Sequence, residues 1–138
     1  MDLSLHHVGL LVKEIKEAAS LYLRLGFLQE TEVIHDPTQT AYVQFFLLPG
    51  EKTYLELVTP DGDESKLANA LRKGGGLNHI CYATGALDET IEELRANDFF
   101  PIAAPLPGVA FKGRRIAWML GPDRSLVELV ERGAEGEL

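Results

Sequence analysis

Apolar positions in the first half of the chain switch between the spacing of strands and that of a helix. Residues 4–12 alternate as a strand does, and a helix follows that ends at Gly26, a residue favoured after a helix C-terminus. The apolar face of that helix is formed by Ile15, Ala18, Ala19, Tyr22 and Leu25. Extended segments are expected at 27–34, 41–48 and 53–58, separated by turns at Asp36-Pro37 and Pro49-Gly50. This half predicts the order β-α-β-β-β.

The second half repeats that order. It predicts a strand over 77–83, a helix over about 87–97, and strands near 99–104, 114–120 and 125–131. Three prolines, Pro101, Pro105 and Pro107, make the strand near 99–104 irregular and place it at a sheet edge. Between the halves, Ser65 is placed to cap a short helix that stops at Gly74-Gly75-Gly76.

The two halves are related by a shift of 72 residues without a gap. This shift pairs His7 with His79 and Glu56 with Glu128, and it sets residues 45–50 opposite residues 117–122. A repeat of this length indicates one supersecondary unit that buries its apolar face on its twin. We therefore expect a single domain with module one over about 4–60, a linker helix over about 61–76, and module two over about 77–132.

Composition excludes several classes of partner. The 138 residues include no apolar run as long as a membrane span, and the N-terminus has no signal-peptide pattern. The formal net charge of −8 argues against nucleic acid and anionic membranes. A lone cysteine, Cys81, cannot form an internal disulfide. We expect a cytoplasmic protein that binds a small molecule.

In each half, the histidine of the first strand precedes the glutamate of the last strand by 49 residues. Strand parity leaves Leu55 and Leu57 facing the core and sets Glu56 on the other side. A carboxylate buried in an apolar strand costs several kcal/mol unless something neutralises it. Taken singly, a strand histidine is a core residue and a strand glutamate a solvated one more often than either is a ligand. The repeated spacing instead favours a shared divalent cation, either Ni, Co, Zn, Mn or Fe(II).

Such a cation acts as a Lewis acid next to a carbonyl, and a glutamate beside it serves as the base that moves the neighbouring proton. Glu128 and Glu56 are the candidate catalytic residues. The aromatic side chains of Phe45, Phe46 and Trp118 are expected in the core.

The duplicated order, together with four motifs, resembles the vicinal oxygen chelate superfamily over nearly the whole chain. These motifs are His-Val-Gly-Leu-Leu-Val, Leu-Glu-Leu-Val-Thr-Pro, Leu-Asn-His-Ile-Cys-Tyr and Leu-Val-Glu-Leu-Val-Glu. The nearest branch contains glyoxalase I and methylmalonyl-CoA epimerase. The resemblance implies an α+β fold in which two βαβββ modules pair into an eight-stranded, partly open barrel-like sheet around a metal site. The ligands it implies are His7, Glu56, His79 and Glu128.

The resemblance implies a glyoxalase-type lyase or isomerase like lactoylglutathione lyase, which moves a proton through a metal-bound enediolate. Its substrate would be the hemithioacetal formed with a thiol cosubstrate. The first alternative is an epimerase that acts on an acyl-CoA, and the second is a non-catalytic drug binder of the bleomycin-resistance type. A homodimer is expected, with the four ligands contributed by one chain or by two.

Five further residues are candidates for substrate binding. Gln44 stands where some bacterial epimerases carry a catalytic glutamate, and Tyr42 is two residues earlier in the same strand. Strand packing would also explain both of them. Lys112, Arg114 and Arg115 form the only basic cluster and suit a carboxylate or a CoA phosphate. Solvated hairpin charges are the alternative for this cluster.

Overall fold

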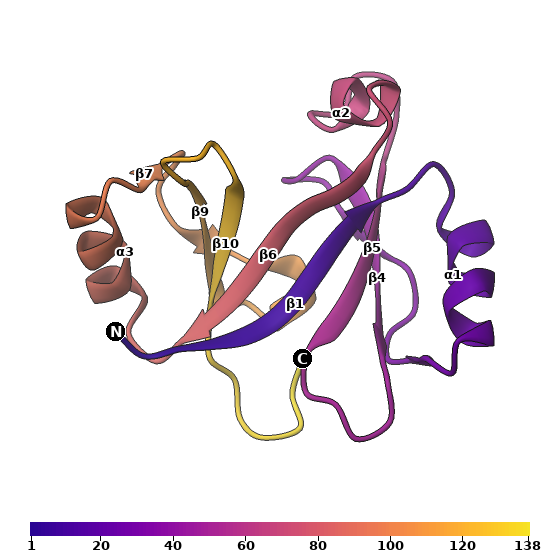
Figure 1. Cartoon of the computed structure of the whole chain (residues 1–138), viewed down its shortest axis with the longest axis horizontal. Helices are drawn as coiled ribbons and strands as arrows, with labels where there is room; N and C mark the ends of the chain where they lie inside the picture. Colours follow the sequence, from indigo (N-terminus) through magenta and orange to yellow (C-terminus); the bar gives the residue numbers. More distant parts are fainter. The chain divides into compact units, whose positions relative to one another are not determined.

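The computed structural model describes all residues, 1–138, as a mixed α+β protein (Figure 1). The first part of the chain forms β1 (Leu3–Leu11), α1 (Ile15–Arg24), β2 (Leu28–Gln29), β3 (Ile34–Asp36), β4 (Ala41–Leu47), β5 (Tyr54–Pro60) and α2 (Ala68–Arg72). The rest forms β6 (Gly76–Thr84), α3 (Leu87–Ala96), β7 (Phe100–Pro101), β8 (Leu106–Pro107), a 3-10 turn (Val109–Phe111), β9 (Arg115–Leu120) and β10 (Leu126–Glu131). The expected α+β class is confirmed. None of the helices has the length and apolar character needed to cross a membrane.

The chain divides into two compact units. The first unit is His7–Asn78, and the second unit combines Met1–His6 with His79–Leu138. The start of β1 is tied into the second unit by Arg132, which donates hydrogen bonds to the Asp2 carboxylate at 2.7 Å and to the backbone oxygen of Ala83 at 3.1 Å. That contact lowers the pKa of Asp2 below its usual range.

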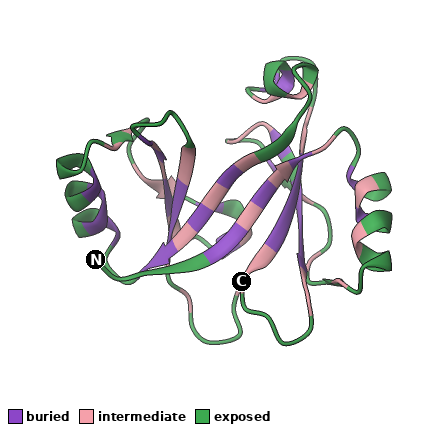
Figure 2. Cartoon of the chain, in the orientation of Figure 1, coloured by how far each residue is buried: buried purple, intermediate pink, exposed green.

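In the first unit the strand order is β2-β4-β5-β1, and β3 pairs with β4. Strands β5 and β1 run parallel, whereas β4 is antiparallel to β5. Helix α1 covers one face of this sheet (Figure 2). Its contact forms a buried apolar cluster of Ile15, Ala19, Phe46, Leu55 and Leu57. Leu55 and Leu57 therefore face the core, as strand parity predicts.

The second unit repeats this plan with the order β6-β10-β9-β7, and β8 pairs with β9. Strands β10 and β6 are parallel, and β9 is antiparallel to β10. The buried side of α3 packs on the sheet and its other side is exposed (Figure 2). The cluster there is Leu87, Ile91, Leu94, Ala117, Met119 and Leu129.

Two expected strands were wrong in extent. Of residues 27–34, only Leu28–Gln29 and Ile34 pair with a neighbouring strand, and Ile34 is the first residue of β3. The strand near 99–104 shrinks to Phe100–Pro101, at the end of the strand order as its prolines predict. Strand β8 and the 3-10 turn were not expected.

The linker helix is also shorter than predicted. It begins after Leu67, whose backbone N–H donates to the Ser65 hydroxyl at 3.1 Å. The run Gly74-Gly75-Gly76 ends it with positive φ at all three residues. At Gly75 a side chain is excluded, because an added Cβ would lie 2.6 Å from the Leu11 carbonyl oxygen.

The gapless alignment of the two halves is off by one residue in their hairpins. Phe45 lies directly opposite Glu56, and Trp118 lies directly opposite Glu128. The structural counterpart of Phe45 is therefore Trp118, and not Ala117 as a shift of 72 would give. The cause is the connection after the strand, which spans residues 48–53 in the first hairpin and only residues 121–125 in the second.

Candidate metal centre

His7 and Glu56 form a buried pair in the first unit. In the parallel register of β1 and β5, Tyr54 lies opposite His7 and Gly9 opposite Glu56. Because side chains alternate along a strand, this offset of two residues sets the imidazole and the carboxylate on one face of the sheet. His7 Nε2 is 3.3 Å from Glu56 Oε1, and both side chains are buried.

His79 and Glu128 form the equivalent pair in the second unit. Cys81, two residues beyond His79, lies opposite Glu128 in the parallel register of β6 and β10. His79 Nε2 is 3.2 Å from Glu128 Oε1, and both side chains are again buried. The duplication therefore preserves the strand register of the pair as well as the residue types.

An aromatic ring stands against each histidine. Phe45 meets His7 edge to face, with ring centroids 5.2 Å apart and planes at 84°. Trp118 meets His79 in the same way at 4.8 Å and 83°. Each ring comes from the residue directly opposite the glutamate, so it excludes water from the pair and limits rotation of the imidazole. Phe45 is completely buried, as predicted for a core aromatic, and the hairpin register places both rings beside the pairs.

The donor atoms of the two pairs suit a divalent cation. Each pair offers an imidazole nitrogen and a carboxylate oxygen on the same strand face, and this nitrogen and oxygen set suits borderline metals such as Ni, Co, Zn and Mn. A neutral imidazole and an ionised carboxylate are the ligand forms that such metals require.

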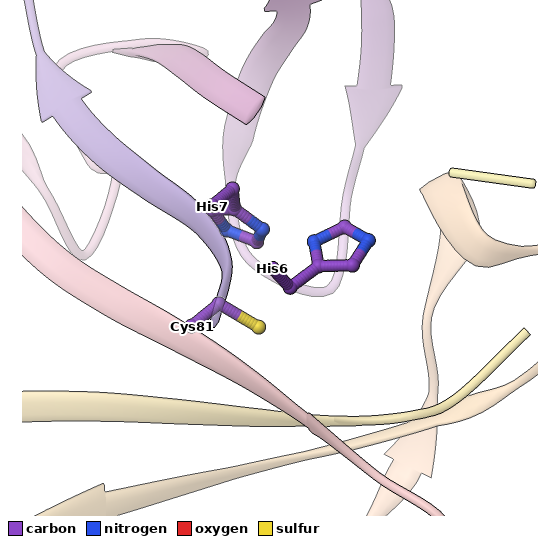
Figure 3. A group of neighbouring side chains, drawn as sticks. All are labelled: His6, His7 and Cys81. Atoms are coloured by element: carbon purple, nitrogen blue, oxygen red, sulfur yellow. The ribbon is translucent and has the colours of Figure 1, made fainter. Parts of the chain in front are cut away.

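Two further buried side chains, those of His6 and Cys81, belong to the second unit. His6 is buried in β1, and Figure 3 draws its side chain together with those of His7 and Cys81. Within the second unit its ring meets Phe111 edge to face at 5.3 Å. The Cys81 side chain is completely buried on β6, the strand that carries His79.

The structure sets Gln44 on the other face of β4 from Phe45. Gln44 lies opposite Leu57, on the side covered by α1, and its amide donates to the Thr31 carbonyl at 2.9 Å. Its side chain therefore points away from the face that carries Glu56. Tyr42 is exposed and its ring lies 4.6 Å from that of His35, which pairs with Asp61 at 2.9 Å.

The basic cluster is largely engaged within the second unit. Arg115 binds the carboxylates of Asp88 at 3.1 Å and Glu131 at 3.0 Å. These contacts raise the pKa of Arg115, and its hydrogen bonds lower the pKa of Glu131. Arg114 donates to the backbone oxygens of Glu131 and Leu138. Lys112 is exposed and adopts a left-handed backbone conformation. Substrate binding by these three side chains stays a prediction.

A cavity of about 560 Å³ lies in the second unit, on the other face of the sheet from the His79–Glu128 pair. Its lining includes Tyr82, Val127 and Leu129, which alternate along their strands with Cys81 and Glu128. It is bounded on one side by Leu94 of α3. This cavity belongs to the packing between α3 and the sheet.

Comparison with known proteins agrees with this architecture. Residues 6–118 match the family profile of the Glyoxalase/Bleomycin resistance protein/Dioxygenase superfamily. A mitochondrial methylmalonyl-CoA epimerase of Dictyostelium discoideum is 27% identical over 132 residues, which cover 93% of this chain and 78% of that protein.

Solved structures show the same likeness. A hypothetical protein from Bacillus halodurans superposes with a TM-score of 0.85 at 26% identity, covering 100% of both chains. Methylmalonyl-CoA epimerase from Mycobacterium tuberculosis superposes with a TM-score of 0.82 at 25% identity, covering 95% of this chain and 89% of that one. The chain therefore belongs to the glyoxalase/bleomycin resistance protein/dioxygenase superfamily.

Proposed function

We propose that this protein is a metal-dependent epimerase that inverts the α-carbon of an acyl-CoA thioester such as methylmalonyl-CoA. The observation that carries the proposal is the pair of buried His–Glu couples in one strand register, at 3.3 Å and 3.2 Å. Epimerase relatives align with most of the chain in sequence and in structure. These relatives favour an epimerase over the lyase expected from the sequence.

The proposed ligands of the metal are His7, Glu56, His79 and Glu128, contributed by one chain or by two chains of a homodimer. When bound, a divalent cation supplies Lewis acidity that stabilises negative charge on substrate oxygens. In each pair Nε2 and Oε1 lie 3.3 Å and 3.2 Å apart, close enough that both atoms would serve as ligands of one cation. Burial of all four side chains keeps competing water away from them.

Epimerisation needs one group that removes the α-proton and one that returns a proton to the opposite face of the carbon. Glu56 and Glu128 are the proposed acid and base, because each contributes a carboxylate oxygen from a different module. One would take the proton from the α-carbon as a carboxylate, and the other, protonated and not acting as a ligand at that step, would return its own proton to the opposite face. Gln44 cannot serve as a second base, because its amide does not titrate and donates to Thr31 on the other face of β4.

A lyase is the second candidate, because one observation favours it. Glu56 is the ligand type of glyoxalase I, whereas some epimerases carry glutamine at that position. The substrate would then be the hemithioacetal of an α-ketoaldehyde and a thiol cosubstrate. Both reactions move a proton next to a carbonyl, so the same four residues would perform either one. Conservation of both pairs between the modules argues against a non-catalytic drug binder.

The test is to strip the purified protein with a chelator, add back Co, Ni, Zn or Mn, and offer each substrate class. Epimerase activity is measured in D₂O as deuterium incorporation at the α-carbon of methylmalonyl-CoA. Lyase activity is measured as thioester formation from the hemithioacetal. We expect metal-dependent exchange that is abolished in Glu128→Gln and retained in Glu64→Gln, which changes an exposed residue. Thioester formation without exchange would replace the epimerase by the lyase, and neither reaction would refute both.

A further inference from the structure

Trp118 places a buried hydrogen-bond donor beside the second His–Glu pair. It lies directly opposite Glu128 in the antiparallel register of β9 and β10, so both side chains share one face of the sheet. Its ring meets His79 edge to face at 4.8 Å. Its indole Nε1 is buried and has no hydrogen-bond acceptor in the protein.

Because no protein atom accepts from the Trp118 N–H, its acceptor has to come from outside the chain. An indole N–H donates only, so it is satisfied by an oxygen and never by a cation. Leaving such a group buried without a partner destabilises the fold, and buried polar groups in proteins nearly always find one. An oxygen that arrives at the His79–Glu128 pair would satisfy it.

The twin module shows that this donor is not needed for packing. Phe45 occupies the same position opposite Glu56 and makes the same edge-to-face contact with its histidine, at 5.2 Å. A phenyl ring thus suffices to hold an imidazole at this point of the fold. The N–H is the polar feature that Trp118 adds over Phe45, and it makes the two His–Glu pairs chemically unequal.

We infer that the Trp118 indole N–H donates a hydrogen bond to an acyl oxygen of the bound substrate. The inference rests on the proposed function, which brings an acyl-CoA to the His79–Glu128 pair. This hydrogen bond comes only from the second module, because Phe45 has no N–H to offer. It requires the substrate to carry an oxygen next to Trp118. It selects acyl-CoA thioesters over ligands that present only apolar groups there. Trp118 is in this sense a specificity-determining residue.

The protein contains a single tryptophan, so its intrinsic fluorescence reports on this position alone. The metal-loaded protein is titrated with propionyl-CoA and, separately, with free coenzyme A, which lacks the acyl oxygen. We expect a saturable change in emission with propionyl-CoA and none with coenzyme A at the same concentration. Unchanged emission at a concentration where calorimetry shows propionyl-CoA bound would overturn the inference.

Two substitutions test the hydrogen bond itself. Trp118→Phe copies the first module, and replacement of Trp118 by benzothienylalanine keeps the ring shape while sulfur takes the place of N–H. We expect each to weaken propionyl-CoA binding and to lower kcat/KM for methylmalonyl-CoA by about ten-fold. The matched control is Tyr82→Phe, which removes a polar hydrogen from an aromatic on the other face of the sheet. It should change neither quantity.

The outcomes separate the inference from the proposed function. One outcome is that the wild-type protein exchanges the α-proton and the benzothienylalanine variant keeps kcat/KM and propionyl-CoA affinity within two-fold of wild type. This outcome would overturn the role of Trp118 and leave the proposed epimerase activity intact. Wild-type protein that binds no acyl-CoA and exchanges no α-proton with any metal would refute the proposed function, and the role of Trp118 with it.

Discussion

Neutralising Glu128 is the perturbation that most directly tests a metal at the His–Glu pairs. Glu128→Gln keeps the size of the side chain and an oxygen able to accept from His79, 3.2 Å away in the wild-type protein. The buried site therefore stays filled and the fold is retained. The substitution removes one negative charge from the proposed ligand set, so its effect should appear when metal is added.

The expected size follows from mass action. A ligand present at about 100 times its dissociation constant stabilises the folded state by about 2.7 kcal/mol. Unfolding entropy of about 2.1 cal/mol/K per residue gives about 0.29 kcal/mol/K for a chain of 138 residues. Metal at that concentration should raise the Tm of the wild-type protein by about 9 °C. A loss of about 100-fold in affinity, the upper end for changes around metal sites, leaves about 0.4 kcal/mol and a rise of only about 1 °C.

The assay is thermal unfolding of chelator-treated protein with and without Zn, Co or Ni, together with metal analysis after dialysis. Glu64→Gln, which changes an exposed glutamate in the linker turn, should follow the wild-type curve. If Glu128→Gln gains as much Tm from metal as the wild-type protein does, Glu128 is no ligand and the proposed four-residue site is wrong. A fall of Tm in the variant before metal is added would instead reveal a structural role.

Three further predictions concern the scaffold around the site. Hydrogen bonds from Arg115 lower the pKa of Glu131 from its ordinary 4.5, so their stabilisation is present at pH 7 and lost as pH falls below 4.5. Glu131→Gln should therefore lower the Tm by a few degrees at pH 7, and this difference from the wild-type protein should shrink as the pH is lowered below 4.5. Gly75→Ala should cost roughly 2–4 kcal/mol in urea unfolding, because its Cβ would lie 2.6 Å from a backbone oxygen of β1, whereas Gly62→Ala in open space should be nearly neutral. Gln44→Ala should leave kcat/KM for methylmalonyl-CoA within two-fold of wild type. A ten-fold loss would indicate that Gln44 contacts the substrate.

The parts of the fold that sequence patterns predicted correctly are those with a clear period. Alternation over β1 and β6 and helical spacing over α1 and α3 place these elements within one or two residues. Strands β2 and β7 were overestimated because only two residues of each find a partner strand. An extended segment with nothing beside it has the same local sequence signature as a strand.

The periodicity of apolar residues cannot predict the register of the hairpins. The run Phe45-Phe46-Leu47-Leu48 is apolar at every position, so alternation cannot say which side chain faces the site. The structure sets Phe45 opposite Glu56 and turns Gln44 to the other face. The expectation that Gln44 contacts substrate required its side chain to lie on the face of Glu56, and the sequence pattern could not decide this.

The sequence by itself determined the α+β plan, its duplication, and the four residues with the chemistry to bind a divalent cation, because spacing and residue type are properties of the chain. The tertiary structure alone brought each histidine to its glutamate, set Phe45 and Trp118 against the imidazoles, and engaged Arg115 with Asp88 and Glu131. The physical reason is that a slip of one residue in strand pairing reverses every side chain, and that register depends on loop length and packing between distant segments.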